Sequence, residues 1–189
     1  MKKFKIKSFC KVNLSLRIIN KLKNHYHNIS SFITFADLHD VISIEKISGL
    51  KDIISFSGRF KKGINNRSNT ITKVLYLLRK KNFFKKIYFR INIKKNIPHG
   101  SGLGGGSSNA ANLLNFFNQK SFLRLSNKEI VKIATQIGFD VPIALQRKNT
   151  FLTGKKEKIL RLNNKLRLNL LIVYPNVICS TKKMYEKNN

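Results

Sequence analysis

A run of glycines and serines is the segment whose residue types best suit chemistry on a phosphate. Five glycines and three serines lie between Pro98 and Asn109. Glycine has no Cβ, so backbone N–H groups there can turn toward a ligand. A helix start adds unpaired N–H donors and a partial positive charge, so the segment predicts a phosphate cradle. Its residues are Pro98, His99, Gly100, Ser101, Gly102, Leu103, Gly104, Gly105, Gly106, Ser107, Ser108 and Asn109.

Two common phosphate motifs do not account for this glycine loop. Gly100, Gly102 and Gly105 spell the dinucleotide fingerprint, but no βαβ unit surrounds them and no acidic residue follows about 20 positions later. Gly106 stands where a Walker A loop needs its lysine. A flexible hinge is the remaining alternative, and the position of the loop directly before a predicted helix favours phosphate binding over it.

The strands expected to position the loop come mostly from the first half of the chain. Alternation of apolar and polar residues predicts strands within 3–19, 30–38, 41–47, 53–58 and 86–96. We expect a polar loop at 20–28, a turn at Asp37–Asp40, and closing strands at 149–154 and 166–174.

Three helices are predicted from their caps. Ser68 or Asn69 can cap the first, and Ser107 or Ser108 the one that follows the glycine loop. The third begins at the capping box of Ser126 and Glu129 and ends at Gly138. Strands first and then mixed helices and strands indicate an α+β fold.

Basic residues dominate the charge, with 38 Lys and Arg against 8 Asp and Glu, a net charge of +30. They are spread along the whole chain, and the aromatic-flanked basic patches of a known RNA module are absent, so we expect no specific nucleic-acid partner. The positive field would still attract a polyphosphate substrate.

The remaining composition indicates a cytoplasmic protein with a packed core. Apolar residues make up 42% of the chain, no run approaches the ~18 apolar residues of a membrane span, and the basic start lacks the features of a signal peptide. We expect no membrane partner. Cys10 and Cys179 lack metal-ligand spacing and are interpreted as small buried hydrophobes in a reducing compartment.

Four colinear motifs carry a resemblance. The glycine loop is similar, almost letter for letter, to that of the galactokinase, homoserine kinase, mevalonate kinase and phosphomevalonate kinase (GHMP) superfamily. Within it, the chain most resembles the kinases that act on 4-diphosphocytidyl-2-C-methyl-D-erythritol. The other three motifs are Cys10-Lys-Val-Asn-Leu-Ser-Leu16, Tyr26-His27 and Gly138-Phe-Asp-Val-Pro142.

The resemblance implies a two-layer, ribosomal-protein-like α+β domain, with a mixed sheet and helices on one face, that binds ATP and Mg²⁺. It implies transfer of the ATP γ-phosphoryl group to the 2-hydroxyl of the cytidine diphosphate-linked methylerythritol, a step of the non-mevalonate isoprenoid pathway. Asp140 would accept the hydroxyl proton, and Lys11 would make the hydroxyl more acidic or keep Asp140 ionised. The Mg²⁺ would be held through the ATP phosphates, with Ser107 as a candidate protein contact.

The resemblance also implies substrate contacts. Asn13, on the strand face of Lys11, would fix the reacting end of the substrate. Tyr26, His27 and Tyr185 would contact its cytosine. The adenine nucleotide would lie near Asn69 and Lys95.

Other interpretations stay open. Asp140 could instead cap the turn that follows it, and His25 replaces the glycine usual before Tyr26. We expect residues 1–160 to form the ATP-binding domain and 161–189 to begin a second domain whose remainder is absent. The rivals to an active kinase are a truncated or inactive relative and, on the strength of the charge, a basic RNA-binding domain.

Overall fold

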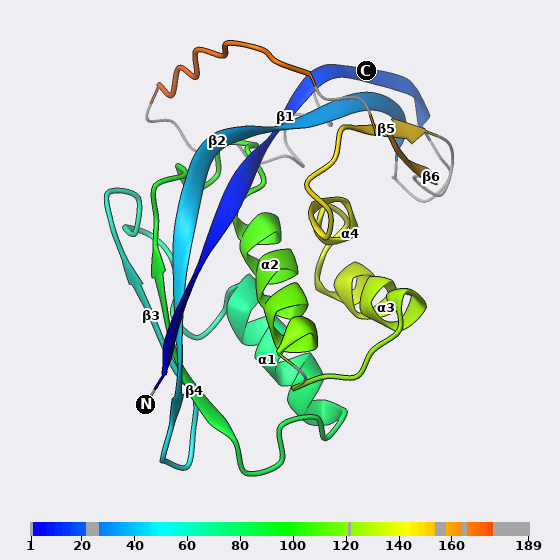
Figure 1. The fold of residues 1–189 in the computed structure, drawn as a ribbon. Helices are drawn as coiled ribbons and strands as arrows, with labels where there is room; N and C mark the ends of the chain where they lie inside the picture. Colours follow the sequence, from blue (N-terminus) through cyan, green and yellow to red (C-terminus); the bar gives the residue numbers. More distant parts are fainter. Residues whose placement is uncertain (1, 22–26, 121, 154–157, 164–165, 176–189) are drawn as a thin grey trace.

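The computed structural model describes residues 2–21, 27–120, 122–153, 158–163 and 166–175, and these form two layers (Figure 1). A six-stranded mixed sheet is one layer, and the helices of the described part lie against one of its faces. This confirms the expected α+β class. The elements in chain order are β1 (Lys3–Lys21), β2 (His27–Ile47), β3 (Ile53–Ser57), α1 (Thr70–Lys80), β4 (Tyr88–Lys94), α2 (Gly105–Gln119), α3 (Asn127–Ile137), α4 (Val141–Ala144), β5 (Thr150–Thr153) and β6 (Lys158–Arg161).

Strand β2 is the centre of the sheet, whose order is β3-β4-β2-β5-β6, with β1 also paired to β2. Its section Val41–Ile47 pairs with β4, and its section Ser31–Ile33 pairs with β5. Strands β3 and β4 are parallel, whereas the other pairs are antiparallel. One long strand therefore joins the half of the sheet that carries β4 to the half that carries β5 and β6.

The turn predicted at Asp37–Asp40 is wrong, because β2 continues through this segment. The β1–β2 ladder shifts register here: Phe9 pairs with His39, whereas Lys11 pairs with Phe35. The extra residues of β2 are accommodated in an irregularity of the ladder, and the polar pattern that suggested a turn marks that irregularity. Asp40 lies next to this irregularity, on the same strand face as the buried Ile42 and Ile44, and is itself fully buried.

A hydrophobic core fills the space between the sheet and the helices. The apolar residues of α1 recur three and four positions apart, at Ile71, Val74, Leu75 and Leu78, and all four are buried. Phe84, Phe89 and Phe117 meet there with ring centroids 4.8 to 5.0 Å apart, in edge or tilted contacts that favour aromatic pairs. This packing fixes α2 against the sheet and so fixes the helix start that follows the glycine loop.

The helix predictions are confirmed in part. Asn69 caps α1, the Ser126–Glu129 box caps α3, and Gly138 ends α3. Helix α2 begins earlier than expected: its N-cap is Gly104, in the left-handed conformation, and neither Ser107 nor Ser108 caps it. The serines lie within the first turn because the glycines before them already adopt helical geometry.

The strand predictions for 53–58, 86–96 and 149–154 are confirmed as β3, β4 and β5. The strand predicted at 166–174 is wrong, because 166–175 has no strand pairing in the structure. Its alternating leucines satisfy the local pattern of a strand, but no neighbouring strand among the described residues offers the hydrogen bonds that a ladder needs. Neither β6 nor the short helix α4 was predicted.

Candidate active site

Three left-handed glycines shape the glycine loop. Gly100, Gly102 and Gly104 have φ angles of 70°, 75° and 65°, which residues with a Cβ adopt only with strain. Their alternation explains the G-x-G-x-G spacing of the sequence as a backbone requirement. Ser101 stabilises the loop internally, because its hydroxyl donates to the carbonyl of Pro98 over 2.9 Å.

The start of α2 offers donors to an anion. Its N-cap, Gly104, makes no side-chain capping bond, and the first N–H bonded within the helix is that of Ser108, which donates to the Gly104 carbonyl over 2.8 Å. The Ser108 hydroxyl is buried and has no hydrogen-bond partner within the described residues. Gly106 accepts a bond of 2.8 Å from the Thr70 hydroxyl, which ties the loop to α1. Open N–H groups on a rigid helix start fit the phosphate cradle predicted from the sequence.

Lys11 lies directly beside the loop. Its backbone N–H donates to the carbonyl of Leu103 over 2.9 Å. A Cβ added at Gly104 would come within 2.7 Å of the Lys11 Cγ, so this position accommodates only glycine while the lysine stem runs across it. Gly104 is therefore required both for the left-handed backbone conformation and for the space that the Lys11 side chain occupies.

The Lys11 ammonium meets two partners. Its Nζ lies 3.3 Å from Asp140 Oδ2 and donates to Asn13 Oδ1 over 2.9 Å. The Asn13 amide in turn donates to the Ser31 hydroxyl over 2.7 Å, and that hydroxyl donates to the carbonyl of Ser15. The lysine side chain is 9% exposed and the Asp140 side chain 42%, so the carboxylate is the accessible member of the pair.

Asp140 stands at the N-cap position of α4 but makes no capping bond there. The alternative that it only caps the following turn is therefore wrong. Arg161, at the end of β6, holds α4 in place: its guanidinium donates over 2.6 Å to each of the carbonyls of Pro142 and Ile143. Burial lowers the pKa of Arg161. Arg161 was not among the predicted site residues, and the only local signal for it is one arginine in a short apolar segment.

A cavity of about 670 Å³ joins these groups. The glycine loop forms one wall, Lys11, Asn13 and Asp140 lie together in the lining, and Phe56, Ile64 and Ile71 contribute apolar surface to it. This size is in the range of small-molecule sites, and its mixed lining suits a ligand with both a charged and an apolar part. The predicted residues Asn69, Lys95 and Asn109 also line it.

The side chains of Asn69, Lys95 and Asn109 are already engaged within the protein. Asn69 accepts the N–H groups of Ile71 and Thr72 and donates to the carbonyls of 65 and 66. Lys95 forms a buried ion pair with Asp40, which also accepts the Asn109 amide over 2.9 Å. Contact of these residues with a nucleotide stays a prediction.

The predicted cytosine contacts fall outside the described part of the chain, apart from the backbone of His27. Tyr26, Tyr185 and the side chain of His27 lie outside the described residues, as do His25 and Cys179; the backbone of His27 begins β2. Cys10 is buried as expected, and burial raises the pKa of its thiol.

The described residues lack two other kinds of feature. Within the described ranges, no helix is both long and apolar enough to cross a membrane. The same residues contain no group of three or more His, Cys, Asp or Glu side chains placed to hold a metal ion.

The chain is similar to known proteins along nearly all its length. Residues 69–148 match the GHMP kinases N terminal domain. A protein of Pelagibacter ubique named 4-diphosphocytidyl-2-C-methyl-D-erythritol kinase is 41% identical over 99% of this chain and 66% of its own length. One of the same name from Petrotoga mobilis is 38% identical over 96% of this chain and 68% of its own.

The similarity to these kinases extends to the three-dimensional fold of a solved structure. The crystal structure of a 4-(cytidine 5'-diphospho)-2C-methyl-D-erythritol kinase aligns with this chain with a TM-score of 0.68 and 26% sequence identity. The alignment covers 84% of this chain and 55% of the chain in the crystal structure. The chain spans 61% to 68% of the length of the curated relatives compared. The similarity therefore covers the portion that carries the glycine loop, Lys11 and Asp140.

Proposed function

The chain belongs to the 4-diphosphocytidyl-2-C-methyl-D-erythritol kinase family of the GHMP kinases, and from this we propose its reaction. It transfers the γ-phosphoryl group of ATP to the 2-hydroxyl of 4-diphosphocytidyl-2-C-methyl-D-erythritol. The observation that carries the proposal is the Lys11–Asp140 pair, 3.3 Å apart, on the cavity wall beside the glycine loop.

In the proposed reaction, Asp140 takes the proton of the substrate hydroxyl as the oxygen attacks phosphorus. Its 42% exposed carboxylate can reach a ligand, and it carries no capping bond that would compete. Lys11 lies between Asp140 and Asn13, where its positive charge would stabilise the alkoxide that develops on the substrate. Because the Asn13 amide is bonded at both ends, we assign it the added role of holding the lysine.

The glycine loop binds the ATP phosphates through backbone N–H groups at the start of α2. Phosphoryl transfer depends mainly on positioning and on stabilising the charge of the transferred group, which fixed N–H donors supply. When bound, Mg²⁺ neutralises phosphate charge, and Ser107, partly exposed in the first turn of α2, is the candidate protein contact for it. Tyr26, His27 and Tyr185 remain the proposed cytosine contacts, with Asn69 and Lys95 near the nucleotide.

The assay measures phosphoryl transfer from labelled ATP to 4-diphosphocytidyl-2-C-methyl-D-erythritol, with galactose, homoserine and mevalonate as competing acceptors. We expect the cytidine compound alone to be phosphorylated. Asp140→Asn should abolish turnover and leave ATP affinity within a few-fold, because the residue serves the acceptor. Asp37→Asn is the matched control, since that carboxylate pairs with Arg147 and its side chain is 95% exposed. Full activity of Asp140→Asn would remove Asp140 from the role of base.

A second measurement addresses the basic charge. RNA binding that falls steeply with salt, together with no saturable ATP binding, would refute the kinase and favour a nucleic-acid role.

We also propose that the chain after Leu162 begins a second domain. The N–H of Leu162 donates to the carbonyl of Asn149, and Arg161 holds α4, so both belong with the first domain and move the proposed boundary slightly beyond 160. Leu171 and Val173 are 90% and 78% exposed, as expected of residues that another layer would cover. In a longer form of the protein, we expect amides of 166–175 to exchange far more slowly than in this chain; equal rates would contradict the proposal.

A further inference from the structure

A buried carboxylate outside all the motifs of the sequence lies beneath the glycine loop. Asp40 is fully buried, lies next to the irregularity in the β1–β2 ladder, and does not line the glycine-loop cavity. It is not a group that can touch a ligand in that cavity. A buried carboxylate is costly unless several donors satisfy it, so its contacts indicate what it does.

Asp40 accepts hydrogen bonds from both flanks of the loop. On the side that enters the loop, Oδ1 accepts the backbone N–H groups of Asn96 and Ile97 over 2.8 and 2.9 Å. On the side that leaves it, Oδ2 accepts the Asn109 amide of α2 over 2.9 Å. The same oxygen pairs with Lys95. One carboxylate therefore fixes the separation between the end of β4 and the start of α2.

The position of the Lys95 ammonium gives an electrostatic reason for a carboxylate at this site. A Cβ at Gly105 would lie 3.2 Å from Lys95 Nζ, so this ammonium packs directly under the first residue of α2. A helix N-terminus carries partial positive charge, and an unpaired buried cation beside it is unfavourable. Asp40 neutralises that cation, so Lys95 can pack against the first residue of α2 without an uncompensated buried charge.

Stability alone is a weak reason for such a pair. Well-packed apolar residues often replace a buried ion pair without loss of stability, so the pair is better understood through the geometry that it sets. We infer that Asp40 is a positioning residue: it holds the two flanks of the loop so that the N–H groups at the start of α2 face the phosphates. The phosphate part of this inference rests on the proposed function, whereas the effect on loop geometry does not.

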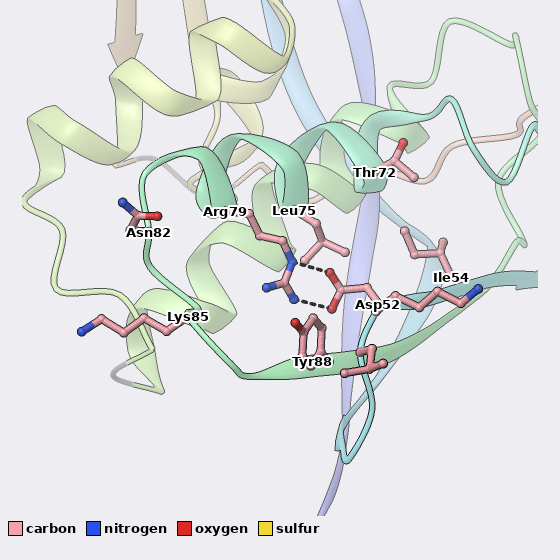
Figure 2. A pocket seen from close by; sticks show the side chains of 10 residues that line it. Asp52, Ile54, Thr72, Leu75, Arg79, Asn82, Lys85 and Tyr88 are labelled. Atoms are coloured by element: carbon pink, nitrogen blue, oxygen red, sulfur yellow. Dashed lines mark hydrogen bonds and ion pairs between the residues drawn. The ribbon is translucent and has the colours of Figure 1, made fainter.

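The chain offers a matched control for Asp40 (Figure 2). Asp52 accepts the Arg79 guanidinium at 2.7 Å on each of its two oxygens and also accepts the backbone N–H of Phe89 over 2.9 Å. It lies in a separate cavity of about 580 Å³ between α1 and β4, and none of the residues lining that cavity lines the glycine-loop cavity. Asp52 thus also accepts a basic side chain and a backbone N–H group, and both of these partners lie outside the glycine loop.

The first test compares amide hydrogen exchange in Asp40→Asn and Asp52→Asn. The amides to follow are those of Lys11 and Ser108, whose bonds to Leu103 and Gly104 report the loop without involving Asp40. Relative to core amides of β4, we expect exchange at both to rise at least about tenfold in Asp40→Asn and to stay unchanged in Asp52→Asn. Equal changes in the two variants would overturn the inference.

The second test is ATP binding by calorimetry in the same variants. We expect Asp40→Asn to weaken ATP binding at least about tenfold, because misplaced donors lose their alignment, and Asp52→Asn to leave it within a few-fold. If the unmodified chain does not bind ATP, the proposed function fails, and the exchange experiment still decides on Asp40. Should Asp40→Asn not fold, Asn109→Ala removes one arm of the same cluster; unchanged exchange at Lys11 and Ser108 in that variant would likewise refute the positioning role.

Discussion

The packing of Lys11 across Gly104 leads to a quantitative prediction for Gly104→Ala. The new Cβ would lie 2.7, 3.0 and 3.1 Å from Cγ, Cδ and Cε of Lys11. The nearest of these atoms is close to the backbone, so the clash cannot be relieved by moving only the end of the side chain. The lysine must change rotamer, and its Nζ then leaves Asp140 and Asn13.

Two effects contribute to the loss of stability expected for Gly104→Ala. Alanine in the left-handed conformation costs about 1–2 kcal/mol, and overpacking adds about 1–3 kcal/mol, so Gly104→Ala should lower the free energy of unfolding by about 2–5 kcal/mol. Gly102→Ala is the control, because Gly102 has a φ of 75° but no atom within 4 Å of its added Cβ. It should show only the backbone part, about 1–2 kcal/mol.

The assay is urea unfolding of both variants, alone and combined with Lys11→Ala. Removing the lysine stem removes the clash, so Gly104→Ala and Lys11→Ala should be coupled by about 1–3 kcal/mol, whereas Gly102→Ala and Lys11→Ala should be additive. In a phosphoryl-transfer assay, Gly104→Ala should lose more turnover than Gly102→Ala. Additivity for both pairs would refute the claim that the lysine stem is fixed against Gly104.

Four further outcomes are expected. Asn69→Ser keeps a capping oxygen and should leave stability nearly unchanged, whereas Asn69→Ala should cost about 0.5–2 kcal/mol in thermal unfolding; a loss of ATP affinity in the serine variant, whose stability is kept, would show that the amide contacts the nucleotide. Arg161→Met should lower stability by about 1–3 kcal/mol, because two short bonds to α4 are lost, and should reduce turnover through Asp140; unchanged urea unfolding would contradict this. In a Cys179→Ser background, Cys10 should resist alkylation until the chain unfolds, because its thiol is buried. Burial raises the pKa of the Cys10 thiol above 9.0. The contribution of this thiol to the free energy of unfolding is therefore present below pH 9.0 and is lost as pH rises through the pKa of the folded state. The Ser126 hydroxyl and N–H lower the pKa of Glu129 below 4.5, so its contribution is present above pH 4.5 and is lost as pH falls through the folded pKa; Glu129→Gln should remove this dependence in a pH series of melting temperatures.

Local sequence pattern predicted several helices and strands correctly, but it failed where pairing between distant strands decides the structure. Helix α1 follows from apolar spacing and Asn69, and α3 from Ser126 and Glu129, because capping and periodicity act within a few residues. The turn expected at Asp37–Asp40 was wrong because the β1–β2 ladder absorbs the extra residues. The strand expected at 166–174 was wrong because its pattern has no paired neighbour in the described part of the chain.

The sequence by itself determined the glycine loop and its place between a strand and a helix, since glycine spacing and helix signals are local properties of the chain. Only the tertiary structure decided which distant groups hold that loop. The resemblance already related Lys11 to Asp140, 129 positions apart, but nothing in the sequence indicated that Asp40 reaches Asn109 across 69 positions. Contacts at such separations leave no periodic trace in the sequence, because the residues meet only once the sheet and the helices have packed.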